Sequence, residues 1–228
     1  MLLENRKITV DSDLEISSAW GIPDNYDAST GSGIILAHGA GNDMHHAFMS
    51  YFHQAFAEAG MLSVKFNFPY TDAGRKAPDR MELLEKTWRA VVNAVRIDSV
   101  LAPKHLYFVG KSMGGRVASH IVAKGERCDG LIFLGYPLHP AKQTEKLRVE
   151  HWADITCPVL FIEGTRDPLC DLELLKAEIK RFPAPTSLHV IEGGDHSFKV
   201  PKSVGIDQEK IFSNVKQEVI TWLATIKA

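Results

Sequence analysis

Leu106-Tyr-Phe-Val-Gly-Lys-Ser-Met-Gly-Gly-Arg-Val-Ala-Ser119 joins a short apolar run to a segment with helical spacing. The run from Leu106 to Val109 has the length and composition of a buried strand, and apolar residues between 113 and 122 then recur on one face of a helix. Between the two, residues 110–114 read Gly-Lys-Ser-Met-Gly, which is the pattern G-x-S-x-G. A serine between glycines at a strand-to-helix turn is typical of a nucleophile elbow. We therefore predict a strand, a tight turn at Ser112 and a helix.

The pentapeptide alone is a weak signal. Because glycine and serine are common residues, chance produces it in roughly one chain of this length in fifteen. Its strand-and-helix setting strengthens the interpretation, and chemically suitable partners elsewhere in the chain have to complete it.

The composition is that of a soluble globular protein. Hydrophobic residues make up 45% and charged residues 24% of the 228 positions, and we predict a single domain over residues 1–228. The net charge of −2 predicts no nucleic-acid partner, and no apolar run is long enough to predict a membrane span. The N-terminus has no apolar signal region, and three cysteines favour reduced thiols. We expect a cytoplasmic protein without a membrane partner.

Short apolar runs alternate with segments of helical spacing. Strands are predicted over residues 6–20 (one or two strands), 33–37, 61–68, 106–109, 130–134, 158–162 and 187–191. Helices are predicted over residues 44–59, 81–95, 113–122, 170–182 and 211–226, with Asp79 at the capping position of the second and a polar loop over 70–78. This alternation predicts an α/β fold, with a mostly parallel sheet and helices on both of its faces.

Polar residues follow three of the predicted strands, at the edge where ligands bind in open parallel sheets. Ser112 follows one strand, Asp167 the next but one, and His196 the last. The order Ser, Asp, His is the one expected for an α/β-hydrolase triad. A serine hydroxyl needs a base such as imidazole to attack, and a carboxylate orients that imidazole. We predict these three residues as the catalytic triad.

Two further carboxylates lie close in sequence. Asp195 is adjacent to His196, so its side chain is expected to point elsewhere, and Asp171 is a second alternative to Asp167. The oxyanion hole is expected to use the backbone N–H of Met113, the residue after the nucleophile, together with that of Ala40 or, alternatively, Gly41.

The chain resembles the α/β-hydrolase superfamily. The residues that carry the resemblance are His38-Gly39, Gly110-Lys-Ser-Met-Gly-Gly115, Gly164-Thr-Arg-Asp167 and Gly194-Asp-His196. Within the superfamily, the chain is similar to the dienelactone-hydrolase-like branch, which includes the testis-expressed-type and histone-acetyltransferase-complex-subunit hydrolases. The segments that carry this similarity are Phe66-Asn-Phe-Pro-Tyr70, Ala73-Gly-Arg75, Tyr136-Pro-Leu-His-Pro140 and the stretch from Leu147 to His151. The resemblance covers residues 30–225 and implies a hydrolase. Dienelactone hydrolases proper use a cysteine nucleophile, and the serine at position 112 argues against carrying over their lactone substrate.

Other polar residues have weaker claims. Glycine at position 105 would complete a phosphate-binding G-x-x-x-x-G-K-S/T loop, but the residue is His105. His45 and His46 lack partners with metal-ligand spacing, so no metal and no cofactor are predicted. His38 is expected to support the oxyanion loop. The remaining candidates for substrate binding are Gly41, His46, Arg75, His139 and His151.

Loops expected above the sheet carry Arg75, Arg148, Glu150 and His151. These side chains face either solvent or a polar or acidic acyl group. About two dozen residues separate the strands at 130–134 and 158–162, too few for a helical cap domain, which favours an open site and small substrates.

These observations predict a carboxylesterase-like serine hydrolase that cleaves small carboxyl esters or thioesters through an acyl-enzyme. Two alternatives stay open: a non-catalytic scaffold or binding subunit with the same fold, and an acyltransferase or perhydrolase that uses the same triad. The only partner predicted is the small-molecule substrate, and the sequence leaves open whether the protein is a monomer or a dimer.

Overall fold

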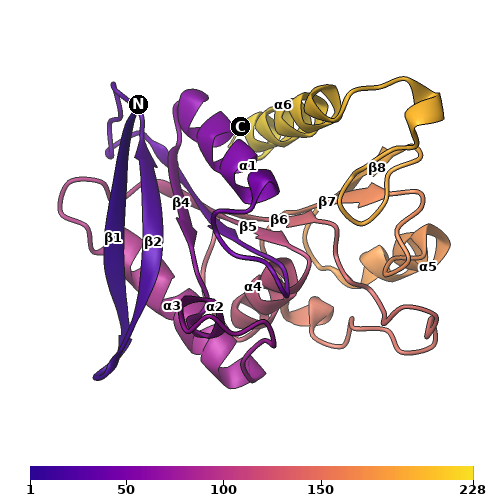
Figure 1. Cartoon of the computed structure of the whole chain (residues 1–228), viewed down its shortest axis with the longest axis horizontal. Coiled ribbons are helices and arrows are strands. Elements are labelled where there is room, and N and C mark those ends of the chain that lie inside the picture. The colour runs from indigo at the N-terminus through magenta and orange to yellow at the C-terminus, as the bar shows by residue number, and fades with distance from the viewer. Residues whose placement is uncertain (228) are drawn as a thin grey trace.

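The computed structural model describes residues 1–227, which form one sheet flanked by helices (Figure 1). Within them the strands are β1 (Leu2–Asp11), β2 (Leu14–Ile22), β3 (Ser32–Ala37), β4 (Leu62–Phe66), β5 (His105–Lys111), β6 (Gly130–Leu134), β7 (Val159–Gly164) and β8 (Thr186–Ile191). The helices are α1 (Ala47–Glu58), α2 (Pro69–Asp72), α3 (Met81–Arg96), α4 (Met113–Ala123), α5 (Leu172–Glu178) and α6 (Gln208–Lys227), with short 3₁₀ helices η1 (Trp152–Asp154), η2 (Ile179–Arg181) and η3 (Lys202–Val204).

The sheet is parallel except at one edge. Its strand order is β1-β2-β4-β3-β5-β6-β7-β8. The hairpin β1–β2 is antiparallel and joins β4 in antiparallel register, whereas every pair from β4 to β8 is parallel. The carboxyl ends of β3, β5, β6, β7 and β8 therefore meet at one edge, which we call the C-terminal edge.

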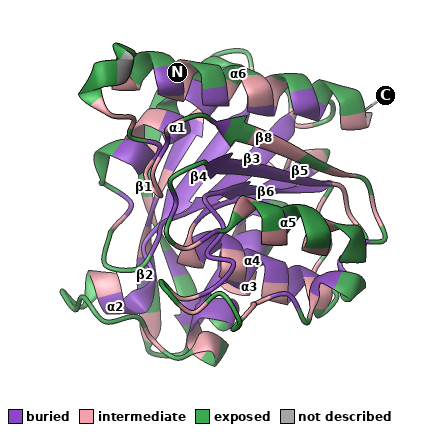
Figure 2. Ribbon diagram, turned by 90° about the vertical axis from the view of Figure 1, so that its right-hand side faces the viewer, coloured by how far each residue is buried: buried purple, intermediate pink, exposed green. Residues whose placement is uncertain are grey.

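Helices cover both faces of the sheet, which confirms the predicted α/β architecture. In Figure 1, α1 and α6 lie on one face, and α3 and α4 lie on the other. Each layer has its own apolar cluster: Phe52 and Trp222 belong to the first, Trp88 and Phe133 to the second. The central strands are buried, except for the half-buried His105 at the start of β5, while the outer faces of the helices are exposed (Figure 2). Burial on both faces explains why these strands read as apolar runs without alternation.

The segment between β4 and α3 differs from the prediction. Instead of a continuous polar loop it begins with the single turn α2, because Pro69 fixes a helical backbone angle at the first position. Asp79 does not cap α3, whose first turn has no side-chain cap. The Asp79 carboxylate instead accepts a hydrogen bond from the Tyr70 backbone N–H at 2.8 Å and pairs with Arg75 at 2.6 Å.

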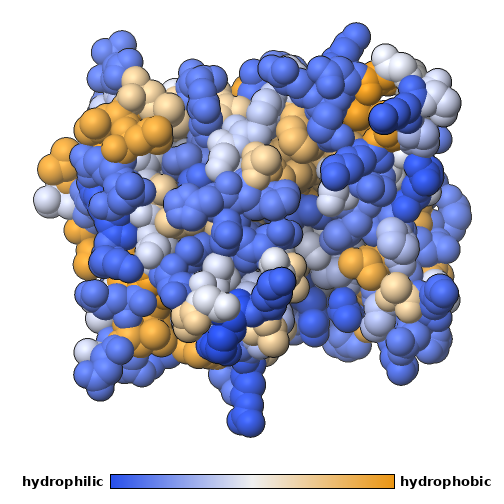
Figure 3. Space-filling model, in the orientation of Figure 1, coloured by the Kyte–Doolittle hydropathy of each residue, from blue (hydrophilic) through white to orange (hydrophobic). Residues whose placement is uncertain are grey.

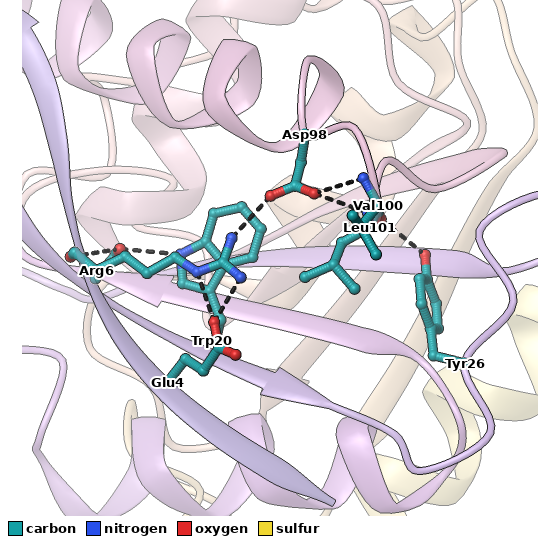
Figure 4. Close-up of polar contacts among 8 residues, drawn as sticks. Glu4, Arg6, Trp20, Tyr26, Asp98, Val100 and Leu101 are labelled. Atoms are coloured by element: carbon teal, nitrogen blue, oxygen red, sulfur yellow. Dashed lines mark hydrogen bonds and ion pairs between the residues drawn. The ribbon is translucent and has the colours of Figure 1, made fainter.

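Polar contacts fasten the N-terminal hairpin to the loop that follows α3 (Figure 4). The guanidinium of Arg6 lies 4.2 Å from the centre of the Trp20 ring and donates to Asp98 at 2.8 Å. Asp98 also accepts from the backbone of Leu101, whose carbonyl accepts from Tyr26 Oη at 3.3 Å. This cation–π and ion-pair network holds the antiparallel edge of the sheet in place, far along the sheet from β7 and β8.

The molecular surface in the view of Figure 3 is largely hydrophilic, with small hydrophobic patches between charged side chains. No helix within residues 1–227 combines the length and the apolar character needed to cross a membrane.

The buried side chain of His53 predicts a pH-dependent stability. Burial, together with the charge of Lys65, lowers the pKa of His53 from 6.5 to about 3. Because the unfolded chain binds this proton below pH 6.5 and the folded chain does not, the stabilisation is complete above pH 6.5 and is lost as pH falls towards 3. His53→Gln should therefore remove up to about 2 kcal/mol of the stability difference between pH 7 and pH 5, measured by urea unfolding.

The matched control is His45→Gln, because His45 is exposed. If the two variants lose stability with the same slope as the wild type, His53 does not hold its neutral form in the folded protein.

Candidate active site

The turn between β5 and α4 holds Ser112 in an unusual backbone conformation. Its φ of 51° and ψ of −117° lie outside the regions that non-glycine residues favour. The neighbouring glycines make this turn possible: a Cβ on Gly110 would lie 2.1 Å from the Gly115 nitrogen, and one on Gly114 would lie 2.5 Å from the Ala37 carbonyl oxygen. Backbone strain of this kind costs of order 1–3 kcal/mol and persists where the surrounding structure holds it. The turn presents Ser112 at the C-terminal edge.

Gly110→Ala should destabilise the protein by at least about 3 kcal/mol, because the added methyl group meets backbone that cannot move aside. Gly125→Ala is the comparison. Gly125 has a φ of 92° but open space around it, so this change should cost only about 1–2 kcal/mol of backbone strain. Chemical denaturation measures both, and equal losses would show that the backbone around Gly110 gives way to the added methyl group.

Asp167 and His196 form a hydrogen-bonded pair at the same edge. Asp167 follows β7, His196 follows β8, and Asp167 Oδ2 lies 2.5 Å from His196 Nδ1. The carboxylate is fully buried and its other oxygen accepts from the Leu169 backbone N–H at 2.8 Å. These contacts fix the orientation of the imidazole and require a proton on Nδ1, which leaves Nε2 unprotonated in the neutral ring.

The two alternative carboxylates are engaged in local structure. Asp195 Oδ1 accepts hydrogen bonds from the backbone N–H groups of Ser197 and Lys199, which shapes the loop that carries His196. Asp171 caps α5 by accepting from Glu173 and Leu174. The structure therefore brings Asp167, and neither of the others, onto the imidazole.

His196 Nε2 is buried and has no hydrogen-bond partner within residues 1–227. The ring borders Gly135, where an added Cβ would lie 3.4 Å from Nδ1, and Ser112 donates its backbone N–H to the neighbouring Leu134 carbonyl at 3.4 Å. Both residues thus pack around the end of β6. In unliganded enzymes a serine–histidine hydrogen bond is often long and tightens when substrate binds.

The loop after β3 lies directly against the predicted nucleophile. A Cβ on Gly39 would lie 3.3 Å from Ser112 Cβ, so any larger residue would require Ser112 to shift by a few tenths of an ångström. The buried His38 supports the loop: Nδ1 contacts the Gly39 carbonyl at 2.8 Å, and Nε2 accepts the Phe68 backbone N–H at 3.2 Å. Burial lowers the pKa of His38, consistent with a neutral ring that serves both contacts. Ala40 and Gly41 are exposed in the turn that follows.

A family model described as an alpha/beta hydrolase domain matches residues 30–224. The chain belongs to this alpha/beta hydrolase family.

Solved structures of similar shape agree with the hydrolase fold. A dienelactone hydrolase from Anabaena variabilis is 16% identical with a TM-score of 0.77, and the match covers 98% of this chain and 97% of that one. Est1E from Butyrivibrio proteoclasticus is 15% identical, with a TM-score of 0.74 and coverage of 96% and 99%. A serine hydrolase without lid from Xanthomonas campestris is 20% identical, with a TM-score of 0.73 and coverage of 96% and 94%.

This hydrolase carries a buried lysine beside the histidine. Lys111 Nζ donates to the His196 backbone carbonyl and lies between the rings of Phe48 and Phe198, 5.7 Å and 5.6 Å from their centres. Burial lowers the pKa of Lys111 to about 8, although the carboxylate of Asp167 acts in the opposite direction. Lys111 lines a small pocket together with Gly39, Asn42, His46, Phe48, Met49 and Ser197.

Glu163, which sequence reasoning did not single out, lies fully buried near this pair. Its Oε1 accepts the Tyr136 backbone N–H at 2.5 Å, and the Cys170 thiol is hydrogen-bonded to the same carboxyl group. Burial and the charge of Asp167 raise the pKa of Glu163 well above its usual range. The available signal was a charged residue closing an otherwise apolar run at the end of β7.

The candidates for substrate binding lie in different surroundings. His46 caps α1 by accepting from the Phe48 backbone N–H and lines the small pocket. His139 is buried, with Nδ1 near the Pro140 carbonyl and Nε2 accepting from the Asp171 backbone N–H, which ties two loops together. Arg75 is exposed and paired with Asp79, while His151 packs against α4.

The segment from 135 to 158 forms loops and the short helix η1, so the part of the chain described places no cap domain over the edge. Within residues 1–227, no group of three or more histidine, cysteine or acidic side chains is arranged to hold a metal ion.

Proposed function

We propose that this chain is a serine hydrolase that cleaves small carboxyl esters or thioesters through an acyl-enzyme on Ser112. The observation that carries the proposal is the 2.5 Å contact between Asp167 and His196 at the edge where the strained turn presents Ser112. A buried carboxylate that fixes an imidazole beside a serine at a strand-to-helix turn is the arrangement that serine activation requires.

In the proposed reaction, Ser112 Oγ attacks the carbonyl carbon of the substrate while His196 Nε2 accepts the serine proton. Asp167 holds the ring in the required tautomer and stabilises the imidazolium that forms. His196 then gives the proton to the leaving alcohol or thiol. Water repeats the attack on the acyl-enzyme, and Ser112 leaves as the acid product forms.

The oxyanion of the tetrahedral intermediate would lie between the first turn of α4 and the loop after β3. The Met113 N–H is at a helix N-terminus, where backbone donors have no partner within the helix. The close approach of Gly39 to Ser112 brings the Ala40 and Gly41 backbone near the same point. Donors that are fixed before the reaction stabilise developing negative charge strongly.

The open edge supports small substrates, because loops rather than a helical cap follow β6. One of the similar structures is a serine hydrolase without lid, which agrees with this class at the level of the fold.

A fluorophosphonate probe tests the proposal directly, because it phosphonylates serines that a neighbouring base activates, with fluoride as the leaving group. Mass spectrometry of the labelled protein should find one adduct on the peptide that contains Ser112, and an unfolded sample should not label. A folded protein that does not react at Ser112 would contradict the proposal and favour a binding or scaffold role. Product analysis with added alcohol or peroxide separates hydrolysis from transfer to these acceptors.

A further inference from the structure

Two arginines near the C-terminal edge lack the acidic partners that neighbouring cations have. Arg89 pairs with Glu126, and Lys124 pairs with Glu85. Arg116 and Arg148, by contrast, form no ion pair with any carboxylate in residues 1–227; Arg148 donates only to the Pro137 carbonyl, at 3.2 Å. Arg116 Nε is buried and has no hydrogen-bond partner in the same residues. A guanidinium that is partly desolvated without a counter-charge is costly unless a ligand supplies one.

Hydrogen bonds and ring contacts bring the two arginines into one cluster. Tyr136 Oη donates to the Arg148 carbonyl at 2.8 Å, and Ser119 Oγ donates to the Arg116 carbonyl at 2.7 Å. Ser119 Oγ also lies 2.7 Å from His151 Nε2. Burial lowers the pKa of Arg148, and the nearby guanidinium of Arg116 lowers it further, so the two positive charges act on each other across the cluster.

Two stacked histidines lie beside the same arginines. The rings of His120 and His151 lie 3.9 Å apart, and each has a buried nitrogen without a partner within residues 1–227, Nε2 in His120 and Nδ1 in His151. Burial lowers the pKa of both rings, and the charge of Arg116 acts in the same direction. The acidic side chains acting on His120 are Glu85, already paired, and the exposed Glu150. An anion bound here would meet the positive charges of Arg116 and Arg148.

The cluster is placed to reach the substrate. Arg116 lies one turn after Ser112 on α4 and donates its backbone N–H to the Ser112 carbonyl at 3.0 Å, so about 6 Å of helix axis separates the two residues. Helical side chains lean towards the N-terminus, which directs Arg116 to the C-terminal edge. Arg148 and Tyr136 follow β6 at that edge. Because the first N–H of α4 is assigned to the carbonyl oxygen under attack, the acyl group would begin about one helical turn from Arg116.

We propose that Arg116 and Arg148 bind a carboxylate at the far end of the acyl group, so that the preferred substrates are half-esters or half-thioesters of dicarboxylic acids. This inference rests on the proposed hydrolase function and adds the class of acyl group to it. Planar guanidinium groups bind carboxylates through paired hydrogen bonds, and two of them beside a hydroxyl and imidazoles select that group over a methyl group of similar size.

The test compares matched 4-nitrophenyl esters. Succinyl, glutaryl and adipyl half-esters carry the terminal carboxylate, and butyryl, valeryl and hexanoyl esters of comparable length do not. At least one charged ester should exceed its neutral partner in kcat/KM by about tenfold or more, and this ratio should fall as salt is added. Neutral esters hydrolysed with equal or greater efficiency would overturn the inference and leave the proposed function intact. No turnover of any ester and no fluorophosphonate adduct would instead overturn the proposed function.

Substitutions of the two arginines test whether they cause the preference for charged esters. Arg116→Met should reduce the charged-to-neutral ratio about tenfold, Arg148→Met should also reduce it, and Arg116→Lys should retain part of it. Arg127→Met is the control, because it removes the same charge from an exposed residue that follows the far end of α4. Thermal unfolding checks that each variant is folded. If Arg116→Met lowers kcat/KM equally for both esters, the arginine supports the structure and the proposed carboxylate site is wrong.

Discussion

Ser112→Ala should lower the kcat for an activated ester by about 10⁴-fold or more, because the variant has no oxygen to form the acyl-enzyme. The residual rate should come from the oxyanion donors and from substrate binding alone. Stability should change little: alanine meets the same backbone angles at position 112, and the hydroxyl group makes no side-chain cap contact with α4. Stopped-flow release of nitrophenol from nitrophenyl acetate should show a burst in the wild type and none in this variant.

The matched control is Ser203→Ala, which removes an exposed hydroxyl group from η3. It should retain the burst and the wild-type rate. A Ser112→Ala variant that keeps more than about one tenth of wild-type kcat would contradict acylation at this residue.

Asp167→Asn should lower kcat by about 10⁴-fold while leaving KM within a few-fold of the wild type. An amide can donate a hydrogen bond to His196 Nδ1, which favours the tautomer with its proton on Nε2, and that nitrogen can no longer accept the proton from Ser112. The buried setting of Asp167 and its contact with the Leu169 backbone N–H should hold the amide in the place of the carboxylate.

Asp171→Asn distinguishes the carboxylates that the sequence left open. Asparagine caps helices about as well as aspartate, so this variant should keep both its stability and its kcat. A large loss of kcat in Asp171→Asn, with wild-type kcat in Asp167→Asn, would show that Asp171 rather than Asp167 orients His196.

Much of the architecture could be predicted because its signals are local. The runs that became β3, β5, β6 and β7 are apolar on both faces, and the segment that became α3 repeats its apolar residues at helical spacing. Both patterns follow from burial, which acts on every residue of an element at once. The turn α2 escaped prediction because a four-residue helix is too short to show a period.

Charged residues were harder to place than apolar ones. Asp79 stands at a capping position in the sequence, yet its carboxylate accepts a hydrogen bond from the Tyr70 backbone and pairs with Arg75. Lys111 and Glu163 come from different strands and are buried side by side with the Asp167–His196 pair, where each alters the charge balance of the others. Such contacts join residues that are dozens of positions apart, so no local pattern records them.

The sequence by itself determined the strand-turn-helix around Ser112, the α/β class and the order in which serine, aspartate and histidine reach the C-terminal edge. It could do so because both signals are local: a crowded turn requires glycine at particular positions, and a buried element requires apolar residues at regular spacing. Only the tertiary structure decided which carboxylate meets His196, and which arginines are left without a partner. Those outcomes depend on distances between separate loops, which are set when the parallel strands align and their ends converge.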